Sequence, residues 1–347
     1  MDKIMAHDLR LYSSVKREFS FHAGSREGFS VWQDTFRRRL RQALGLELLK
    51  NDLQDYHPKA EQVLEEDLVT YRREKWYLWV EPDIALPFYL LLPKNVLEPL
   101  PLVLTPHGHN PPHIYLGIYE NEEEQREILD GDRDIAVQAV GEGYLVIAPT
   151  ARGFGETRTE EDQTKHNVHS CRTLLMHDLL VGRTPIGDRV WDITCLIDWA
   201  LENLPVDPSR IAITGNSGGG TIALFAAACD TRLTVSVPSC YFCTFAGSIG
   251  SIYHCDCNFV PGLLRLGEMY DVAGLIAPRP FLAIAGREDP IFPLAETQIA
   301  FECLKTIYAY AGAPENCQLY IGEGGHRYYK AGAWPFIRKH FNADIAR

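Results

Sequence analysis

The stretch IAITGNSGGGTIALFAAA, residues 211–228, decides the fold. Its first four residues are small or apolar, as in a short buried strand, and its last eight predict a helix rich in Ala and Leu. Between them, Gly215-Asn216-Ser217-Gly218-Gly219 fits the pattern Gly-x-Ser-x-Gly. A strand, a tight glycine turn and a helix are the context in which this pattern exposes a nucleophilic serine. We therefore predict that Ser217 stands on a sharp turn above the edge of a sheet.

The glycines of this turn have a steric reason, because a side chain at Gly215 or Gly219 would collide with neighbouring backbone. The first amides of the helix point at the same place as the serine and stabilise negative charge there. A glycine-rich phosphate loop is the alternative. However, the stretch has neither a Gly-Lys-Ser/Thr ending nor the spacing Gly-x-Gly-x-x-Gly.

Apolar strands alternate with helices along most of the chain. Such alternation specifies a mostly parallel sheet with helices on both faces, so the predicted fold class is α/β. Two alternating runs between residues 67 and 93 predict earlier, antiparallel strands. The later strands are expected at 102–105, 144–148, 211–214, 233–237, 281–285 and 318–321, and the helices at 128–140, 190–204, 294–310 and 330–341. Ligands of such sheets bind at the carboxyl ends of the strands.

The chain divides into a predicted helical extension, residues 1–66, and a main domain, residues 67–347. In the extension, apolar residues recur every three or four positions between 26 and 49, which predicts an amphipathic helix. We expect this helix to lie on the main domain, and an arm that binds a partner is the alternative. The apolar face comprises Phe29, Trp32, Phe36, Leu40, Leu44 and Leu48, and the basic outer face Arg37, Arg38, Arg39 and Arg41.

Charge and composition exclude some classes of partner. A net charge of -12 argues against nucleic acid, since phosphate binding needs a basic face. The start, Met1 to Asp8, lacks the apolar core of a signal peptide, and no segment has the length of a membrane helix, so no membrane partner is expected. Nine cysteines without a secretory signal indicate reduced thiols, and we expect a cytoplasmic protein. A homo-oligomer is an alternative to a monomer that the sequence does not exclude.

Two residues that follow later strands have the chemistry that a serine nucleophile needs. A serine hydroxyl requires a histidine base that is held by a carboxylate. In the order serine, acid, histidine, the acid comes after the strand 281–285 and the base after the final strand. We assign Asp289 as the acid and His326 as the base, with Glu288 as the rival acid.

The oxyanion of an acyl transfer needs at least two amide donors. Gly218, which follows the serine, supplies the first. The second is expected from the loop after the strand 102–105, where Gly108 permits close approach of the backbone and the amide of His109 is our choice.

Histidine and cysteine pairs raise the question of a metal. His107 and His109 have no clear third ligand, and Cys240-x-x-Cys243 with Cys255-x-Cys257 does not have the spacing of a zinc ribbon. We expect these cysteines to be buried or to line a pocket. The sequence thus predicts neither a metal nor an organic cofactor.

Seven short motifs resemble the α/β-hydrolase superfamily, and most closely its bacterial branch related to acetyl xylan esterase and dienelactone hydrolase. They are His107-Gly108-His109, Arg152-Gly153-Phe154-Gly155, Gly215-Asn216-Ser217-Gly218-Gly219, Tyr253-His254-Cys255-Asp256-Cys257-Asn258, Ala277-Pro278-Arg279-Pro280, Asp289-Pro290-Ile291-Phe292-Pro293 and Gly325-His326. The resemblance implies an α/β-hydrolase catalytic domain over 67–347 with a cap-like insertion near 239–266. It also implies a serine ester hydrolase whose small-molecule substrates include acetylated carbohydrates.

Two positions depart from that pattern. True dienelactone hydrolases have a cysteine where this chain has Ser217, so that activity is not expected. Many relatives have Asp where this chain has Ala151, next to Arg152, which we expect to be a structural anchor that bonds neighbouring carbonyls. A serine peptidase of the prolyl-oligopeptidase type is a rival, but the residues before the domain cannot supply its β-propeller. A non-catalytic binding protein of the same fold would not need all three of Ser, Asp and His.

Aromatic residues of the insertion are candidates for the substrate pocket. Tyr241, Phe242, Tyr253 and His254 follow the strand 233–237, at the edge where the serine is expected. Bulky rings near a nucleophile leave room only for a short acyl chain, so we expect a preference for acetyl esters. The alternative is that these rings complete the core beneath the insertion.

Overall fold

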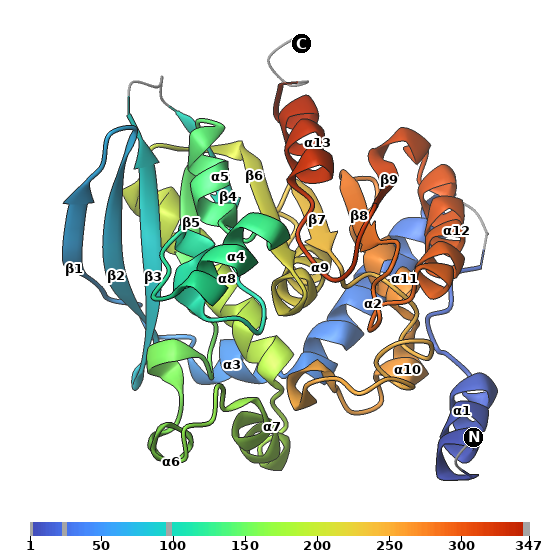
Figure 1. The fold of residues 1–347 in the computed structure, drawn as a ribbon. Coiled ribbons are helices and arrows are strands. Elements are labelled where there is room, and N and C mark those ends of the chain that lie inside the picture. Colours follow the sequence, from blue (N-terminus) through green and yellow to red (C-terminus); the bar gives the residue numbers. More distant parts are fainter. Residues whose placement is uncertain (1–2, 23–25, 95–98, 343–347) are drawn as a thin grey trace.

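One nine-stranded sheet organises the part of the chain that the computed structural model describes, residues 3–22, 26–94 and 99–342. Figure 1 shows the sheet between layers of helices. Its strands are β1 (Ala60–Asp67), β2 (Tyr71–Glu81), β3 (Ile84–Pro93), β4 (Leu100–Leu104), β5 (Leu145–Pro149), β6 (Val206–Asn216), β7 (Val235–Ser239), β8 (Phe281–Gly286) and β9 (Cys317–Gly322). Their order across the sheet is β1-β2-β3-β5-β4-β6-β7-β8-β9. The predicted α/β fold is thereby confirmed.

The direction of the strands divides the sheet into two parts. β1, β2, β3 and β5 pair antiparallel in turn, as predicted for the runs between residues 67 and 93. From β5 through β4 to β9, all neighbouring strands are parallel. The carboxyl ends of the parallel strands therefore meet at one edge of the sheet.

The helical prediction for residues up to 66 is wrong in one place, because Ala60–Asp67 forms β1. This strand lies at the edge of the sheet, and seven of its eight residues are exposed. Its sequence, AEQVLEED, therefore lacks the alternation of apolar and polar residues that marks a half-buried strand. Pairing with β2 stabilises it instead.

Separate apolar cores cover the two faces of the sheet. One core contains residues of α8 (Pro185–Asn203), α9 (Gly218–Cys229), α11 (Met269–Gly274) and α12 (Leu294–Tyr310). The other contains residues of α5 (Ile135–Gly141) and α13 (Lys330–Asn342), with the 3-10 turn η1 (Pro112–Leu116). Helices on both faces leave the ends of the strands as the accessible part of the sheet.

The N-terminal helix α2 (Arg26–Leu44) packs on the first of these layers, against α8 and α9. Phe36, Leu40 and Leu44 are fully buried there. Arg37 does not lie on a solvent-facing basic side as expected: its Nε donates to Ala228 O (3.0 Å) and its Nη2 to Leu275 O (2.8 Å). It thus satisfies carbonyls near the carboxyl ends of α9 and α11, which have no intrahelical partner.

Residues in the left-handed region interrupt two predicted helices. Gly45 (φ 85°) separates α2 from α3 (Leu46–Asp52), and Asp132 (φ 50°) lies between α4 (Glu122–Gly131) and α5. The remaining elements are α1 (Lys3–Ser14), α6 (Glu160–Thr164), α7 (Cys171–Leu180), α10 (Leu263–Leu266), η2 (Gly155–Thr157), η3 (Asp256–Asn258) and η4 (Pro314–Asn316). No helix in the described ranges is both long and apolar enough to cross a membrane.

The burial of α2 predicts a large loss of stability for Phe36→Ala. Phe36 is fully buried and stacks on Phe19 at 4.9 Å, and deletion of a buried aromatic ring costs about 3–5 kcal/mol. Val31→Ala on the same helix is the control, because Val31 is 66% exposed and should change stability by less than about 0.5 kcal/mol. Urea unfolding of the two variants measures the difference. Equal stability of the two would mean that α2 does not pack on the domain.

Candidate active site

Ser217 stands on the turn between β6 and α9, where the sequence placed it. Its backbone has φ 58° and ψ −118°, a strained conformation that the chain tolerates at functional turns. The Ser217 amide donates to Ser239 O (2.9 Å), which ties the turn to the end of β7. A Cβ on Gly219 would lie 2.1 Å from Pro106 O, so the turn also depends on close approach of the loop after β4.

Asp289 and His326 meet at the same edge of the sheet, after β8 and β9. His326 Nδ1 lies 2.8 Å from Asp289 Oδ2, and the Asp289 side chain is fully buried. Its other oxygen, Oδ1, accepts from the amides of Ile291 and Phe292, both at 3.0 Å. Burial by itself raises the pKa of Asp289, but the hydrogen bond and charge of His326 and the two amides outweigh it, so the pKa lies below its usual value. The rival acid, Glu288, is exposed.

The loop after β4 passes close to the turn that carries Ser217. A Cβ on Gly108 would lie 2.8 Å from Asn216 O and 3.4 Å from Ser217 Cβ, so only glycine fits beside the turn. The amide of His109, the next residue, donates to no other group of the described residues. Gly218 begins α9, and its amide has no intrahelical partner. Neither of the two amides predicted for the oxyanion is therefore engaged by another group of the described residues.

His107 has a structural role in this loop. Its Nε2 accepts from the Ala151 amide (2.9 Å), so its Nδ1 carries the proton and donates to Gly108 O (2.6 Å). Burial lowers the pKa of His107 to about 3, which keeps the ring neutral. With both ring nitrogens engaged, His107 cannot share a metal with His109.

Two arginines hold the surrounding loops. Arg152 is buried and pairs with Asp192 (2.6 Å) and Glu81, so it is an anchor as expected, although its partners are mainly carboxylates rather than carbonyls. Arg133 was not predicted. Its Nη1 donates to Asn110 Oδ1 (2.9 Å) and its Nη2 to His326 O (3.4 Å). It lies between α4 and α5, and no local sequence pattern distinguishes it from a surface arginine.

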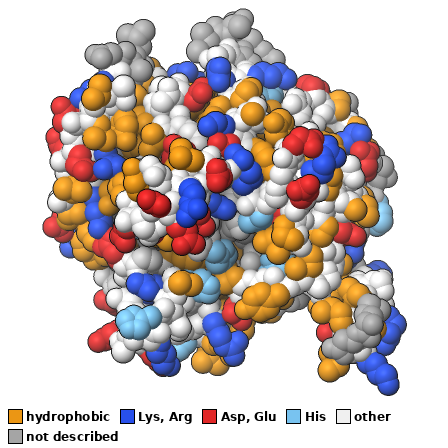
Figure 2. All heavy atoms as spheres, in the orientation of Figure 1, with side chains coloured by type: hydrophobic (Ala, Val, Ile, Leu, Met, Phe, Trp, Pro, Cys, Tyr) orange, Lys and Arg blue, Asp and Glu red, His pale blue; other side chains and the backbone are white. Residues whose placement is uncertain are grey.

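A cavity of about 310 Å³ opens onto Ser217, Gly218, His109 and His326. Figure 2 shows histidine side chains about a hollow near the middle of this face. Three of the four predicted pocket residues, Tyr241, Tyr253 and His254, line the cavity, with Phe292, Asn258 and Arg133 among the others.

Phe242, the fourth predicted pocket residue, is placed elsewhere. It is buried in the core and packs edge-on against Phe281, with ring centroids 5.3 Å apart. Tyr241 and Phe242 are adjacent in sequence after β7, but their side chains point in different directions. Tyr241 forms part of the cavity wall, and Phe242 points into the core. Tyr253, by contrast, is 91% exposed and forms part of the rim.

The two cysteine pairs that are close in sequence, Cys240 with Cys243 and Cys255 with Cys257, do not form one cluster in the structure. All nine are free, and Cys240 lies beside Asp289 and His326, where its thiol donates to Arg327 O (3.2 Å). Cys255 and Cys257 lie instead with Cys171 and His109.

Comparison with known proteins agrees with this architecture. Residues 4–328 match the Abhydrolase family. The curated protein "Putative hydrolase YtaP" of Bacillus subtilis (strain 168) is 26% identical over 291 residues, which are 80% of this chain and 90% of that protein.

Solved structures show the same fold. A "putative acetyl xylan esterase" from Bacteroides fragilis NCTC 9343 superimposes with a TM-score of 0.73 at 18% identity, over 96% of this chain and 84% of that one. "Methylesterase BT1017" gives a TM-score of 0.70 at 19% identity, over 99% and 69%. A glucuronoyl esterase from Solibacter usitatus gives 0.59 at 12% identity, over 98% and 91%.

The neutral, buried His107 predicts a loss of stability in acid. The pKa of His107 is about 3 in the folded chain against an ordinary value of 6.5, so between these pH values only the unfolded chain binds the proton. Unfolding is then favoured as the pH falls, by about 2 kcal/mol from pH 6.5 to pH 5. His107→Gln should flatten the pH dependence of urea unfolding in this range by about that amount. Parallel profiles for the two proteins would contradict the assignment.

Proposed function

Because this chain belongs to the Abhydrolase family of α/β-hydrolases, we propose that it is a serine-dependent carboxylic ester hydrolase. The observation that carries the proposal is the Asp289–His326 hydrogen bond of 2.8 Å at the cavity that also contains Ser217. Each of the three residues follows a different strand of the parallel sheet. Their types and their order along the chain are those of an activated serine nucleophile.

In the proposed reaction, Ser217 Oγ attacks the acyl carbon while His326 takes the hydroxyl proton. Asp289 accepts a hydrogen bond from His326 Nδ1, which leaves Nε2 to act as the base. The amides of Gly218 and His109 stabilise the oxyanion. His326 then gives its proton to the leaving alcohol, and a water molecule hydrolyses the acyl-enzyme by the same route. No metal or organic cofactor touches the reacting atoms in this scheme.

The proposed substrates are small acetylated carbohydrates or similar short-chain esters. Three observations support this class: the size of the cavity, the aromatic wall of Tyr241 and Phe292, and the exposed Tyr253 at the rim, where a sugar ring could stack. The names of two structural relatives, a putative acetyl xylan esterase and a glucuronoyl esterase, support esters of carbohydrates, and the name of a third, a methylesterase, supports an ester.

Ser217→Ala should abolish turnover and leave the fold intact. Loss of the nucleophile commonly lowers the rate by about 10⁴ to 10⁶. Ser209→Ala, at the other end of β6, is the matched control and should keep full activity. Hydrolysis of 4-nitrophenyl acetate and labelling by a fluorophosphonate probe measure the effect. If purified Ser217→Ala keeps more than about a tenth of the activity, another residue is the nucleophile.

Acyl length provides the second test. We expect activity to be highest on acetyl esters, lower on butyryl esters and small on octanoyl esters. Tyr253→Ala should raise the butyryl-to-acetyl ratio of kcat/KM, because the ring lines the cavity. Phe242→Ala should leave that ratio unchanged and lower stability by about 3–5 kcal/mol, because Phe242 is a core residue. A changed ratio for Phe242→Ala, or an unchanged ratio for Tyr253→Ala, would contradict this account of the pocket.

A further inference from the structure

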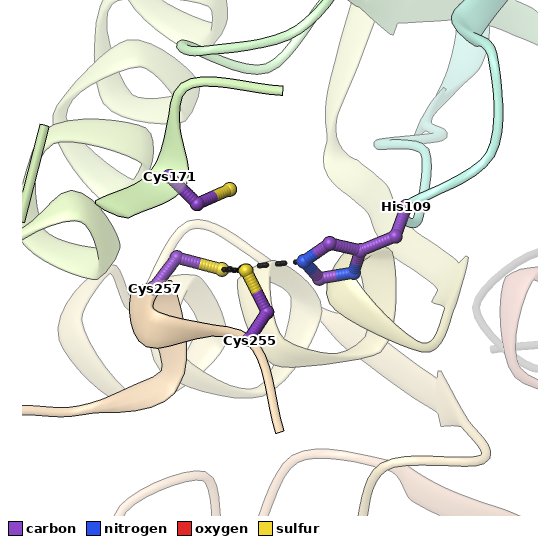
Figure 3. A group of neighbouring side chains, drawn as sticks. All are labelled: His109, Cys171, Cys255 and Cys257. Atoms are coloured by element: carbon purple, nitrogen blue, oxygen red, sulfur yellow. Dashed lines mark hydrogen bonds between the residues drawn. The ribbon is translucent and has the colours of Figure 1, made fainter. Parts of the chain in front are cut away.

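Four side chains with metal-binding atoms converge beside the active-site cavity: His109, Cys171, Cys255 and Cys257. Figure 3 shows them pointing toward one another from three segments of the chain, the loop after β4, the start of α7 and the η3 region. The four ligand atoms all lie within 4.8 Å of one another. Cys257 Sγ is 3.4 Å from His109 Nε2 and 3.5 Å from Cys255 Sγ.

These separations fit a tetrahedral zinc ion. With Zn–S bonds of about 2.3 Å and a Zn–N bond of about 2.0 Å, tetrahedral angles place sulfur atoms about 3.8 Å apart and sulfur about 3.5 Å from nitrogen. Three cysteines and one histidine are an established donor set for structural zinc. Thiolate ligands also exclude magnesium and calcium, which prefer oxygen.

The charge around the cluster supports the same donor set. Arg189 is buried, and its Nη2 donates to Cys171 Sγ (3.4 Å) and to Arg152 O (2.9 Å). None of the ion pairs formed within the described ranges includes Arg189. A buried cation requires a compensating negative charge. Three thiolates, a neutral histidine and Zn²⁺ carry a net charge of −1, which Arg189 neutralises.

The surroundings enclose two of the four ligands, while His109 and Cys255 are half-buried and line the cavity. Cys171 and Cys257 are buried, and the rings of Phe154 and His169 pack edge-on against His109, with centroids at 5.3 and 5.6 Å. Cys171 is the first residue of α7, where the helix dipole favours a thiolate. Asp256, between the two nearer cysteines, interacts with Arg172 of α7 (3.4 Å), so the two segments are also joined outside the cluster.

We propose that His109, Cys171, Cys255 and Cys257 bind one structural zinc ion. This differs from the sequence prediction of no metal, because Cys171 lies 84 residues from Cys255 and no local spacing connects the two. The four protein ligands complete the tetrahedron, so the ion has no open position for substrate or water. Its role is to join α7 and the η3 region to the loop that carries the His109 amide.

The zinc also determines the state of the His109 ring. Binding through Nε2 leaves the proton on Nδ1, and a Cβ on Gly218 would lie 3.0 Å from that nitrogen. The Nδ1–H therefore lies beside Gly218, whose amide is one of the two proposed oxyanion donors. This consequence rests on the proposed ester hydrolysis, whereas the metal site itself does not.

Metal analysis of the full-length protein, purified under reducing conditions without chelators and dialysed against zinc chloride, tests the site directly. We expect about one tightly bound zinc per chain, by analogy with other Cys₃His sites. Cys171→Ser, Cys255→Ser and Cys257→Ser should each lose most of it. Cys303→Ser is the matched control, since Cys303 is a partly buried thiol outside the cluster, and it should keep the zinc.

A measurement on the wild-type chain covers variants that fail to fold. Replacement of zinc by Co²⁺ should produce the thiolate charge-transfer and tetrahedral d–d absorption bands of a Cys₃His site. Any one of four results would overturn the proposal. They are the absence of these bands, a wild-type chain that retains no zinc after dialysis, full zinc content in the folded cysteine variants, and a disulfide among the three cysteines under reducing conditions.

Kinetics separate this proposal from the proposed function. Folded Cys171→Ser should lower kcat on 4-nitrophenyl acetate by about 10- to 100-fold with little change in KM, as for loss of a residue that orients a group at the active site. If Cys171→Ser loses zinc but keeps its kcat, the result supports the metal site and contradicts its effect on catalysis. A zinc-loaded wild-type chain that neither hydrolyses esters nor reacts with fluorophosphonate would contradict the ester hydrolase alone.

Discussion

The active-site geometry depends on the close approach of two backbone segments, the loop after β4 and the turn after β6. Pro106 O would lie 2.1 Å from a Cβ on Gly219, and Asn216 O 2.8 Å from a Cβ on Gly108. Glycines on both sides of this contact allow the loop that carries His109 to lie beside the turn that carries Ser217. A parallel pairing of β4 with β6 holds the two segments in register, Leu104 opposite Ile213.

Buried polar groups maintain this contact. His107 accepts from the Ala151 amide and donates to Gly108 O, so it links the loop after β5 to the loop after β4. Arg133 bonds Asn110 and the carbonyl of His326, which joins the same loop to the segment after β9. Two further buried arginines lie near these loops. Arg152 pairs with carboxylates, and Arg189 lies beside the cysteine cluster. The segments after β4, β5 and β9 are thus tied together by polar groups that were desolvated on folding and are costly to separate.

The same logic explains why the cluster of three cysteines is significant. Loops between elements are ordinarily the least stable parts of a domain, since few buried contacts hold them. Here the cysteine cluster is built from such segments, the loop after β4, the start of α7 and the region of η3. A zinc ion that links these segments to His109 would hold them in place, as apolar packing holds the strands and helices of the two cores. The N-terminal helix α2 is held against α9 without a metal, by its buried apolar residues and by the hydrogen bond from Arg37 to Ala228 O.

Local chemistry in the sequence was sufficient to predict the α/β sheet, the turn at Ser217, and the two residues, Asp289 and His326, that bond to each other at the same cavity. Glycine requirements, the period of apolar residues and the order of motifs are all properties of short segments. Tertiary structure decided the rest. β1 exists only because β2 is beside it, and Tyr241 and Phe242 are adjacent in sequence yet face the cavity and the core. Arg133 reaches His326, and Cys171 meets Cys255 and Cys257, across distances along the chain that no local pattern encodes. Those contacts follow from how the strands are ordered and how the loops pack above them.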